Sequence, residues 1–381
     1  MAQIAFVSDM AGYPWGGSEE LWSRAALRLV GEGHSISASV VEWHPLHSRV
    51  RYLIENGIRL YPRPQWLGMT SRIMRKVWHK SRDPFALAVD ALIKREQPDL
   101  AVFSAGAPFP LVVEGPETCI ARGVPFAVIA QANWDMLWPD DEATRRYREA
   151  MIRARRYYFV SHANLRLAER QLGCDLPNAE VVQNPFNVGF DTKIPWPKTN
   201  GTIKLACVAR LHPPSKGQDL LFEALSEPQW QERDWHLSLY GEGPSRDTLQ
   251  RLAARLKIDL KMTFTEQHPV VEDIWRKHHA IVLPSRAEGL PLVVVEAMLC
   301  GRPVVTTDVA GNGEVVTDNA TGFLAKSATA RSIGRALERF WDNRSRLQEI
   351  GEAGAKSIRQ WAHPDPVGVF SNKIKALTLR I

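Results

Sequence analysis

Short apolar runs alternate with helix-length amphipathic stretches along the whole chain, and this alternation restricts the fold more than any other feature. The first half contains the runs IAFVSD, SISASVV, LAVFSA, FAVIAQ and YYFVSH, and the second half contains IKLACVA, HLSLYG, KMTFT, AIVLPS and PVVTTD. Short β-rich runs that are separated by helix-length segments are typical of parallel sheets covered by helices on both faces. The pattern therefore predicts an α/β fold with two Rossmann-like, doubly wound parallel sheets.

Residues 184–202 separate the two sets of strands. This segment, NPFNVGFDTKIPWPKTNGT, contains several prolines and glycines and has no sustained period, so it is predicted to be an interdomain linker. A chain of 381 residues is long enough for two domains. We expect an N-terminal domain at 1–185 and a C-terminal domain at 186–361, with a central cleft where the carboxyl ends of the two sheets face each other.

Composition and charge exclude several classes of protein. Hydrophobic residues make up 45% of the chain and charged residues 24%, which is ordinary for a globular protein. No run approaches the length of a membrane span and the N-terminus lacks the pattern of a secretion signal, so we expect neither. Cys119, Cys174, Cys207 and Cys300 lie far apart in the sequence, which favours reduced structural cysteines in a cytoplasmic protein. The net charge of +6 is spread over both halves, which argues against a nucleic-acid partner.

Residues 63–82 are a local exception to this even distribution of charge. The segment RPQWLGMTSRIMRKVWHKSR contains basic residues and no acid, with tryptophans and aliphatic residues between them. Such a segment suits the surface of an anionic membrane, and it predicts peripheral contact at the inner membrane face. An amphipathic helix packed on its own sheet fits the same pattern.

The most informative stretch is AIVLPSRAEGLPLVVVEAMLCGRPVVTTD, residues 280–308. Pro291 is predicted to be the first residue of a helix that ends before Gly301. The N-terminus of a helix favours an anion such as a diphosphate, and Glu288 and Glu296 could then bind hydroxyl groups of the sugars on either side of it. An ordinary surface salt bridge is the alternative.

Two cations precede another predicted helix, which lies earlier in the chain and begins near Gln218. Arg210 and Lys216 suit a diphosphate held without a metal ion, because arginine offers a planar fork and lysine a point charge. Solvated loop charges are the alternative. Gly241 and Gly243 follow another strand, where the backbone could approach a ligand, although a Gly-x-Gly pair more often marks a turn.

The first predicted strand runs into a glycine pair. Gly16 and Gly17 could turn their backbone N–H groups towards a phosphate, just before a helix that begins near Glu20 and ends near Val30. A flexible turn with Ser18 as the helix N-cap is the alternative. The chain contains no Asp-x-Asp pair, no Gly-x-Ser-x-Gly elbow, no His-Glu-x-x-His sequence and no phosphate-binding loop, which disfavours metal-centred and serine-nucleophile chemistry.

In combination, these motifs resemble the retaining glycosyltransferases of family 4 (glycosyl transferases group 1), which have the GT-B fold. The resemblance is strongest over residues 203–326, and it rests on Glu288-x7-Glu296 within EGLPLVVVEAM, Arg210-x5-Lys216, the Gly241/Gly243 turn, the Gly16–Gly17 loop and the sequence VVQNPFN. It implies transfer of a sugar, without a metal or cofactor, from a UDP- or GDP-sugar to a glycan or lipid-linked acceptor in polysaccharide or glycolipid biosynthesis. It also implies that a last helix within 362–381 packs on the N-terminal domain.

The resemblance also implies a role for each matching residue. Arg210 and Lys216 would hold the diphosphate and stabilise its charge as the glycosidic bond breaks, and Glu288 would contact the transferred sugar. The predicted donor-binding residues are Gly16, Gly17, Gly241, Gly243, Gly289, Leu290, Pro291 and Glu296, the last of which would bind the ribose.

The acceptor side departs from the family pattern. Many members carry a histidine after the strand that here reads FAVIAQANWD, whereas this chain has Gln131, Asn133 and Asp135. Asn133 and Asp135 are the acceptor-side candidates. A sugar-nucleotide epimerase or phosphorylase of the same fold and a non-catalytic sugar-nucleotide-binding protein are alternatives. A dehydrogenase is disfavoured, because Arg246 stands where a third glycine would complete the dinucleotide fingerprint.

Overall fold

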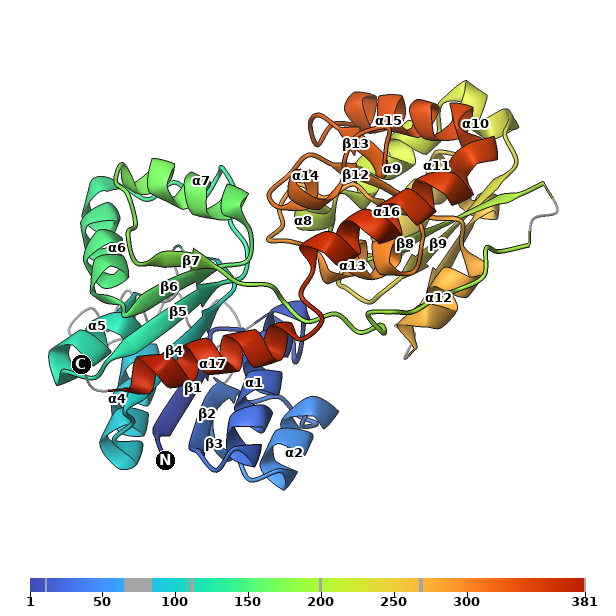
Figure 1. Cartoon of the computed structure of the whole chain (residues 1–381). Coiled ribbons are helices and arrows are strands. Elements are labelled where there is room, and N and C mark those ends of the chain that lie inside the picture. The colour runs from blue at the N-terminus through green and yellow to red at the C-terminus, as the bar shows by residue number, and fades with distance from the viewer. Residues whose placement is uncertain are drawn as a thin grey trace. The chain divides into compact units, whose positions relative to one another are not determined.

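The computed structural model describes residues 1–10, 12–64, 84–107, 109, 113–198, 201–266 and 270–379. The chain divides into two compact units, which are Met1–Pro185 together with Asp365–Ile381, and Phe186–Pro364 (Figure 1). Each unit has its own parallel sheet with helices on both faces. The predicted fold class, α/β with two Rossmann-like parallel-sheet domains, is therefore confirmed.

Unit 1, the unit formed by 1–185 and 365–381, has a parallel sheet with the order β3-β2-β1-β4-β5-β6-β7. Its strands are β1 (Gln3–Ser8), β2 (Ser35–Val41), β3 (Arg59–Arg63), β4 (Leu100–Ala105), β5 (Phe126–Ala130), β6 (Arg156–Phe159) and β7 (Ala179–Val181). Its helices are α1 (Glu20–Gly31), α2 (Ser48–Glu55), α4 (Pro84–Glu96), α5 (Glu114–Arg122), α6 (Asp141–Arg153), α7 (His162–Leu172) and α17 (Pro366–Thr378), with a 3-10 turn η1 (Gly17–Glu19).

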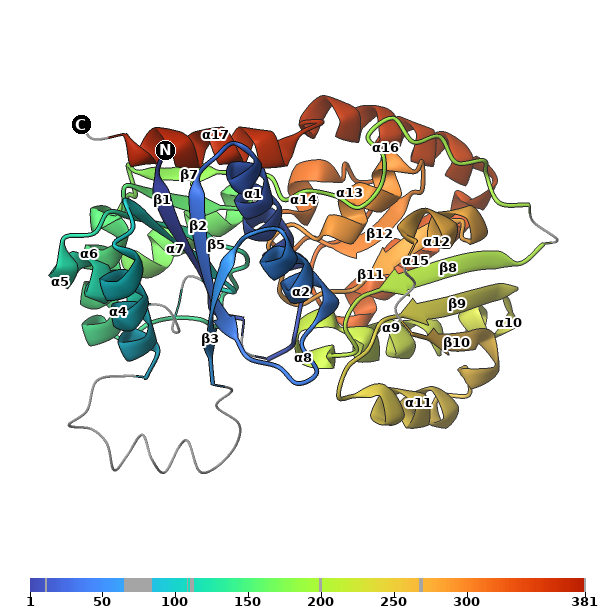
Figure 2. The same ribbon diagram turned by 90° about the horizontal axis from the view of Figure 1, so that it is seen from below.

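Alternate side chains of the strands of unit 1 pack into two apolar layers. In β1, Ile4 and Phe6 pack with residues of α1, α2 and α17, whereas Ala5 and Val7 pack with residues of α4, α5, α6 and α7. Figure 2 shows α17 lying beside α1, and buried Phe370 of α17 belongs to the same layer. The strand order changes direction between β1 and β4, so the carboxyl ends of these strands form the switch point at which such sheets bind ligands.

Unit 2, the unit formed by 186–364, has a parallel sheet with the order β10-β9-β8-β11-β12-β13. Its strands are β8 (Ile203–Val208), β9 (Trp235–Tyr240), β10 (Met262–Thr265), β11 (Ala280–Leu283), β12 (Val304–Thr307) and β13 (Gly322–Ala325). Its helices are α8 (Pro213–Lys216), α9 (Gln218–Leu225), α10 (Pro228–Glu232), α11 (Arg246–Arg255), α12 (Val271–Lys277), α13 (Leu292–Leu299), α14 (Asn312–Val315), α15 (Ala330–Asp342) and α16 (Leu347–Trp361), with 3-10 turns η2 (Asp259–Lys261) and η3 (Arg344–Arg346).

The segment predicted to be an interdomain linker is a packed part of unit 2 from Phe186 onwards. Phe186 and Phe190 pack on the apolar layer that includes α12 and α13. Arg359 donates hydrogen bonds to the carbonyl oxygens of Phe190 and Thr192, and buried Arg302 donates to the carbonyl oxygen of Pro195. The linker prediction was wrong for this part, because the aromatic residues between the prolines bury apolar surface that a free linker would expose.

All the apolar runs identified in the sequence form strands, and three further strands were not predicted. These three, β3, β7 and β13, all lie at sheet edges. The four cysteines are free, and Cys119, Cys207 and Cys300 are buried. Within the described ranges, the chain has no helix that is both long and apolar enough to cross a membrane.

Candidate functional site

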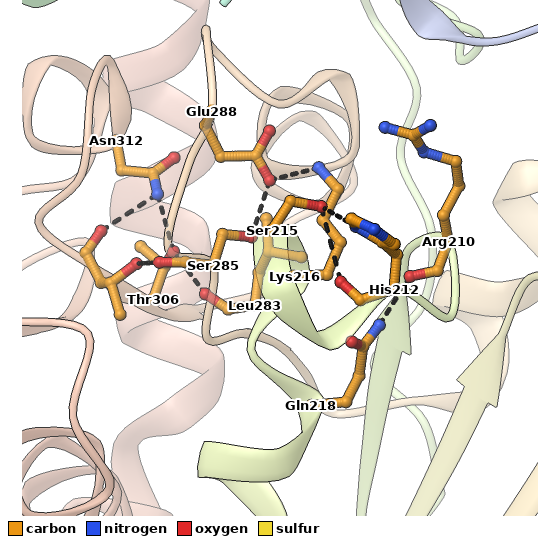
Figure 3. Close-up of polar contacts among 11 residues, drawn as sticks. Arg210, His212, Ser215, Lys216, Gln218, Leu283, Ser285, Glu288, Thr306 and Asn312 are labelled. Carbon is orange, nitrogen blue, oxygen red and sulfur yellow. Dashed lines mark hydrogen bonds and ion pairs between the residues drawn. The ribbon is translucent and has the colours of Figure 1, made fainter. Parts of the chain in front are cut away.

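The residues of the main candidate site follow two neighbouring strands of unit 2. Strands β8 and β11 pair in parallel, so their carboxyl ends lie at the same edge of the sheet. Lys216 follows β8 and Glu288 follows β11, and Lys216 Nζ lies 2.5 Å from Glu288 Oε1. The two side chains are only 16% and 8% exposed, so this ion pair is largely shielded from water (Figure 3).

The loops that carry these two residues are interlocked by backbone contacts. Gly217 has φ of +65°, and a Cβ atom there would lie 2.1 Å from the carbonyl oxygen of Pro284. Arg286 donates its backbone N–H to the carbonyl oxygen of Ser215 at 2.8 Å, and its guanidinium pairs with Asp219 at 2.7 Å. The relative position of Lys216 and Glu288 is therefore fixed by the backbone as well as by their own contact.

Arg210 lies near the pair and is exposed. Its backbone carbonyl oxygen accepts a hydrogen bond of 2.7 Å from Gln218 Nε2, which anchors the chain between β8 and α9. Figure 3 shows its guanidinium extending towards the same side as the Lys216 ammonium and the Glu288 carboxylate. Partial burial lowers the pKa of nearby His212, and the charges of Arg210 and Lys216 lower it further. These two cationic side chains favour an anion beside them.

The loop after Glu288 leads directly into α13. Pro291 is the N-cap of this helix and not its first helical residue, because its ψ of 124° is extended. The carbonyl oxygen of Gly289 accepts a hydrogen bond from the N–H of Gly311, and the Leu290 side chain is buried in the apolar layer. Gly301 follows the helix with φ of +71°, as expected for a helix end.

Glu296 of α13 is 4% exposed. Its Oε1 atom accepts hydrogen bonds of 2.9 Å from both the backbone N–H and the side-chain amide of Asn187. Glu296 thus ties the start of unit 2 to α13. Any ribose bound by this carboxylate would share it with Asn187.

Gly241 and Gly243 have a structural explanation. A Cβ atom on Gly241 would lie 2.2 Å from the carbonyl oxygen of Ala209, and one on Gly243 would lie 2.5 Å from that of Leu211. The close approach that requires these glycines is to the protein's own backbone. Their predicted donor-binding role therefore gains no support from this packing.

In unit 1, the predicted phosphate loop leads into acidic residues. Gly17 begins the turn η1, and the N-cap of α1 is Glu19 rather than Ser18. Glu19 accepts a hydrogen bond from the Trp22 indole, and Glu20 accepts one from Trp15. Because the positive end of α1 already carries two carboxyl groups, a phosphate at Gly16–Gly17 would compete with them.

Asp9, Glu19 and Arg63 form a largely buried cluster of ionisable side chains beside this loop, and it was not predicted from the sequence. Burial raises the pKa of Asp9 and of Glu19 to about 7. Arg63 is 4% exposed and donates to Ser39 Oγ and to the carbonyl oxygen of Ser8. Arg63 therefore does not belong to an exposed basic surface, which corrects the start of the predicted membrane segment. Residues 65–82 of that segment lie outside the described residues.

The acceptor-side candidates make contacts within unit 1. Asn133 is 1% exposed, donates to Gln171 Oε1 at 2.8 Å and accepts from the backbone N–H of Trp134. Asp135 is exposed and pairs with Arg170. Asn133 is thus occupied by protein groups, and its acceptor role stays a prediction without structural support. The described part of the chain brings no three His, Cys, Asp or Glu side chains into a metal-binding group.

Comparison with known proteins finds a family match for the part of the chain that contains this site. Residues 202–343 match the family model of glycosyl transferases group 1, so this part of the chain is a glycosyl transferases group 1 domain. The chain is 31% identical over 207 residues to a GDP-mannose-dependent alpha-(1-6)-phosphatidylinositol monomannoside mannosyltransferase of Mycolicibacterium smegmatis, covering 49% of this chain and 52% of that protein. It is 32% identical over 171 residues to a D-inositol 3-phosphate glycosyltransferase of Nocardia farcinica, covering 42% and 38%. The chain spans about half, or less, of the length of these curated relatives.

Solved structures are similar over nearly the whole chain. Anabaena Alr3699/HepE in complex with UDP and glucose has a TM-score of 0.75 and 17% identity, covering 99% of this chain and 100% of that one. Sucrose-phosphate synthase from Thermosynechococcus elongatus has a TM-score of 0.75 and 14% identity, covering 99% and 98%. These likenesses agree with the fold derived above, and the structural neighbours are GT-B glycosyltransferases.

Proposed function

We propose that this protein is a retaining glycosyltransferase that moves a sugar from a UDP- or GDP-sugar to a hydroxyl group of a glycan or lipid-linked acceptor. The observation that carries the proposal is the shielded Lys216–Glu288 pair, held at the carboxyl edge of the sheet inside a glycosyl transferases group 1 domain. The names of the relatives support it, because they describe transferases of mannosyl and other glycosyl groups.

In the proposed reaction, positive charge stabilises the leaving group. The Arg210 guanidinium and the Lys216 ammonium would bind the diphosphate, and the N-terminal end of α13 would face it. The bond between the anomeric carbon and the phosphate oxygen breaks, and a bond to the acceptor oxygen forms on the same face. The acceptor proton passes to the departing phosphate oxygen, so the charges at this site act by positioning and by stabilising the transition state.

Glu288 would accept hydrogen bonds from hydroxyl groups of the transferred sugar. A lone carboxylate beside a diphosphate would repel it, but Lys216 compensates the charge of Glu288. Gly289, Leu290 and Pro291 would lie along the donor at the helix end, and Glu296 would bind the ribose. The phosphate-binding role of Gly16 and Gly17 stays a prediction. The proposal includes no cofactor, because the donor itself is the activated substrate.

A thermal-shift screen of UDP-, GDP-, ADP- and dTDP-sugars tests the donor site. One nucleotide class should raise the melting temperature, because a bound ligand stabilises the folded state by mass action. Lys216→Ala should abolish the shift, whereas Lys356→Ala, which changes an exposed lysine of α16, should preserve it. The absence of both a shift and any transfer with the whole panel would refute the proposal.

Incubating the donor without an acceptor separates the remaining alternatives. A transferase should give at most slow hydrolysis, an epimerase would give an isomeric nucleotide sugar, and a non-catalytic protein would bind without turnover across an acceptor panel.

Membrane contact through residues 63–82 stays a prediction. Co-sedimentation with anionic liposomes that does not change when Arg72, Arg75, Lys76 and Lys80 are neutralised would remove it.

A further inference from the structure

A buried hydroxyl group lies directly behind the Glu288 carboxylate. Ser285 is fully buried, and its Oγ atom donates a hydrogen bond of 2.6 Å to Glu288 Oε1, the same oxygen that contacts Lys216. The backbone carbonyl oxygen of Ser285 accepts a hydrogen bond of 2.6 Å from Thr307 Oγ1. Ser285 is therefore held by the end of β12 while it holds Glu288.

The support for Ser285 continues into the core of unit 2 (Figure 3). Asn312, also fully buried, donates its side-chain amide to Thr306 Oγ1 and to the carbonyl oxygen of Thr307, both at 3.0 Å. Thr306 in turn donates to the carbonyl oxygen of Leu283 at 2.8 Å. These neutral groups tie the carboxyl ends of β11 and β12 together in a buried layer, where hydrogen bonds are strong and geometrically demanding.

The two donors to Glu288 Oε1 differ in what a ligand would do to them. Lys216 carries a charge, and a bound diphosphate would compete with the carboxylate for its ammonium. The Ser285 hydroxyl is neutral and lies behind Glu288 in the protein interior. Its hydrogen bond would therefore persist when the donor binds, and it would keep the carboxylate in one orientation.

We propose that Ser285 is a positioning residue that orients Glu288 towards the transferred sugar, so that its hydroxyl controls binding of the sugar and not of the nucleotide. This inference rests on the proposed function, because it takes Glu288 as the group that contacts the sugar. A purely structural serine would affect nucleotide and nucleotide sugar alike. The ratio of the two affinities is thus the decisive quantity.

The test compares Ser285→Ala with the wild-type protein by isothermal titration calorimetry. The probes are UDP with UDP-glucose, and GDP with GDP-mannose. Loss of a hydrogen bond to a charged group should weaken binding of the nucleotide sugar about tenfold. The dissociation constant of the nucleoside diphosphate should change less than about twofold.

Two threonines provide matched variants in the same layer. Thr307→Val removes the hydroxyl that holds Ser285, and it should weaken nucleotide-sugar binding in the same direction by about threefold. If Ser285→Ala fails to fold, Thr307→Val still tests the positioning role. Thr306→Val removes a buried hydroxyl that donates to the Leu283 carbonyl oxygen and accepts from Asn312 but makes no hydrogen bond with Ser285. It should leave the ratio of the two affinities within about twofold of wild type.

The outcomes separate this inference from the proposed function. Equal weakening of nucleotide and nucleotide sugar in Ser285→Ala, or no weakening of either, would overturn the positioning role while leaving the enzyme assignment intact. If the wild-type protein bound none of the four probes, both would be overturned. Selective loss of nucleotide-sugar binding in Ser285→Ala and Thr307→Val, but not in Thr306→Val, would support the role.

Discussion

Replacing Glu19 with glutamine should make the stability of unit 1 less dependent on pH. The Glu19 carboxyl is 3% exposed, and burial raises its pKa from an ordinary value of 4.5 to about 7. Hydrogen bonds from Ser8 and Trp22 and the charge of Arg63 oppose the rise, whereas neighbouring Asp9 adds to it. The folded state therefore favours the protonated form of this group.

The raised pKa fixes both the direction and the size of the effect. A carboxyl whose pKa is higher in the folded than in the unfolded state contributes stability that is fully present below about pH 4.5. This contribution is lost as the pH rises through about 7. At about 1.4 kcal/mol for each pH unit between the two pKa values, the loss is at most about 3.5 kcal/mol. Glutamine stays neutral, so Glu19→Gln should keep this stability at pH 8.

Urea unfolding at pH 5, 6, 7 and 8 measures this, with unit 1 followed through hydrogen exchange of peptides from β1. The free energy of unfolding of the wild-type protein should fall across this range, and the fall should be smaller in Glu19→Gln. Glu55→Gln, which changes an exposed carboxyl of α2, is the matched control and should follow the wild type. An identical pH dependence in wild type and Glu19→Gln would refute the assignment of a raised pKa.

Three further substitutions test unit 2. Gly217→Ala would combine a positive φ with an overlap on the Pro284 carbonyl oxygen, so it should cost about 3 kcal/mol in urea unfolding and reduce the donor-induced thermal shift. Arg302→Leu would leave the Pro195 carbonyl without its buried donor, and we expect a loss of about 2 kcal/mol and faster limited proteolysis around residue 195. Arg210→Lys keeps the charge but loses the planar fork, so the dissociation constant of the donor should rise about fivefold in calorimetry. Unchanged values in these assays would contradict the respective contacts.

The central strands could be predicted from the sequence, whereas of the edge strands only β10 could. Strands such as β1 and β11 are buried on both faces, so their central residues form a continuous apolar run. Strand β3, with the sequence RLYPR, and β7, with AEV, are only partly buried at the edges. Their sequences resemble loops, because pairing on one side sets their structure and leaves little apolar signal.

Residue types and spacing predicted that Arg210, Lys216 and Glu288 belong to one site, and the structure brings Lys216 and Glu288 together at one edge of the sheet. The direct contact between Lys216 and Glu288 could not be predicted, because it depends on the parallel pairing of β8 with β11. Contacts across the fold also engage Glu296 and explain Gly241 and Gly243. The raised pKa values of Asp9 and Glu19 come from burial, which local sequence does not reveal.

The Lys216–Glu288 pair is shielded from water, and this shielding would affect the rate of the proposed reaction. Both side chains have lost most of their hydration in the protein as it stands, and Ser285 and the interlocked loops hold them in place. A donor that enters would therefore meet charges that are already oriented and desolvated. Little further reorganisation would be needed as negative charge develops on the leaving diphosphate, and such preorganised charges stabilise a transition state more than mobile surface charges do.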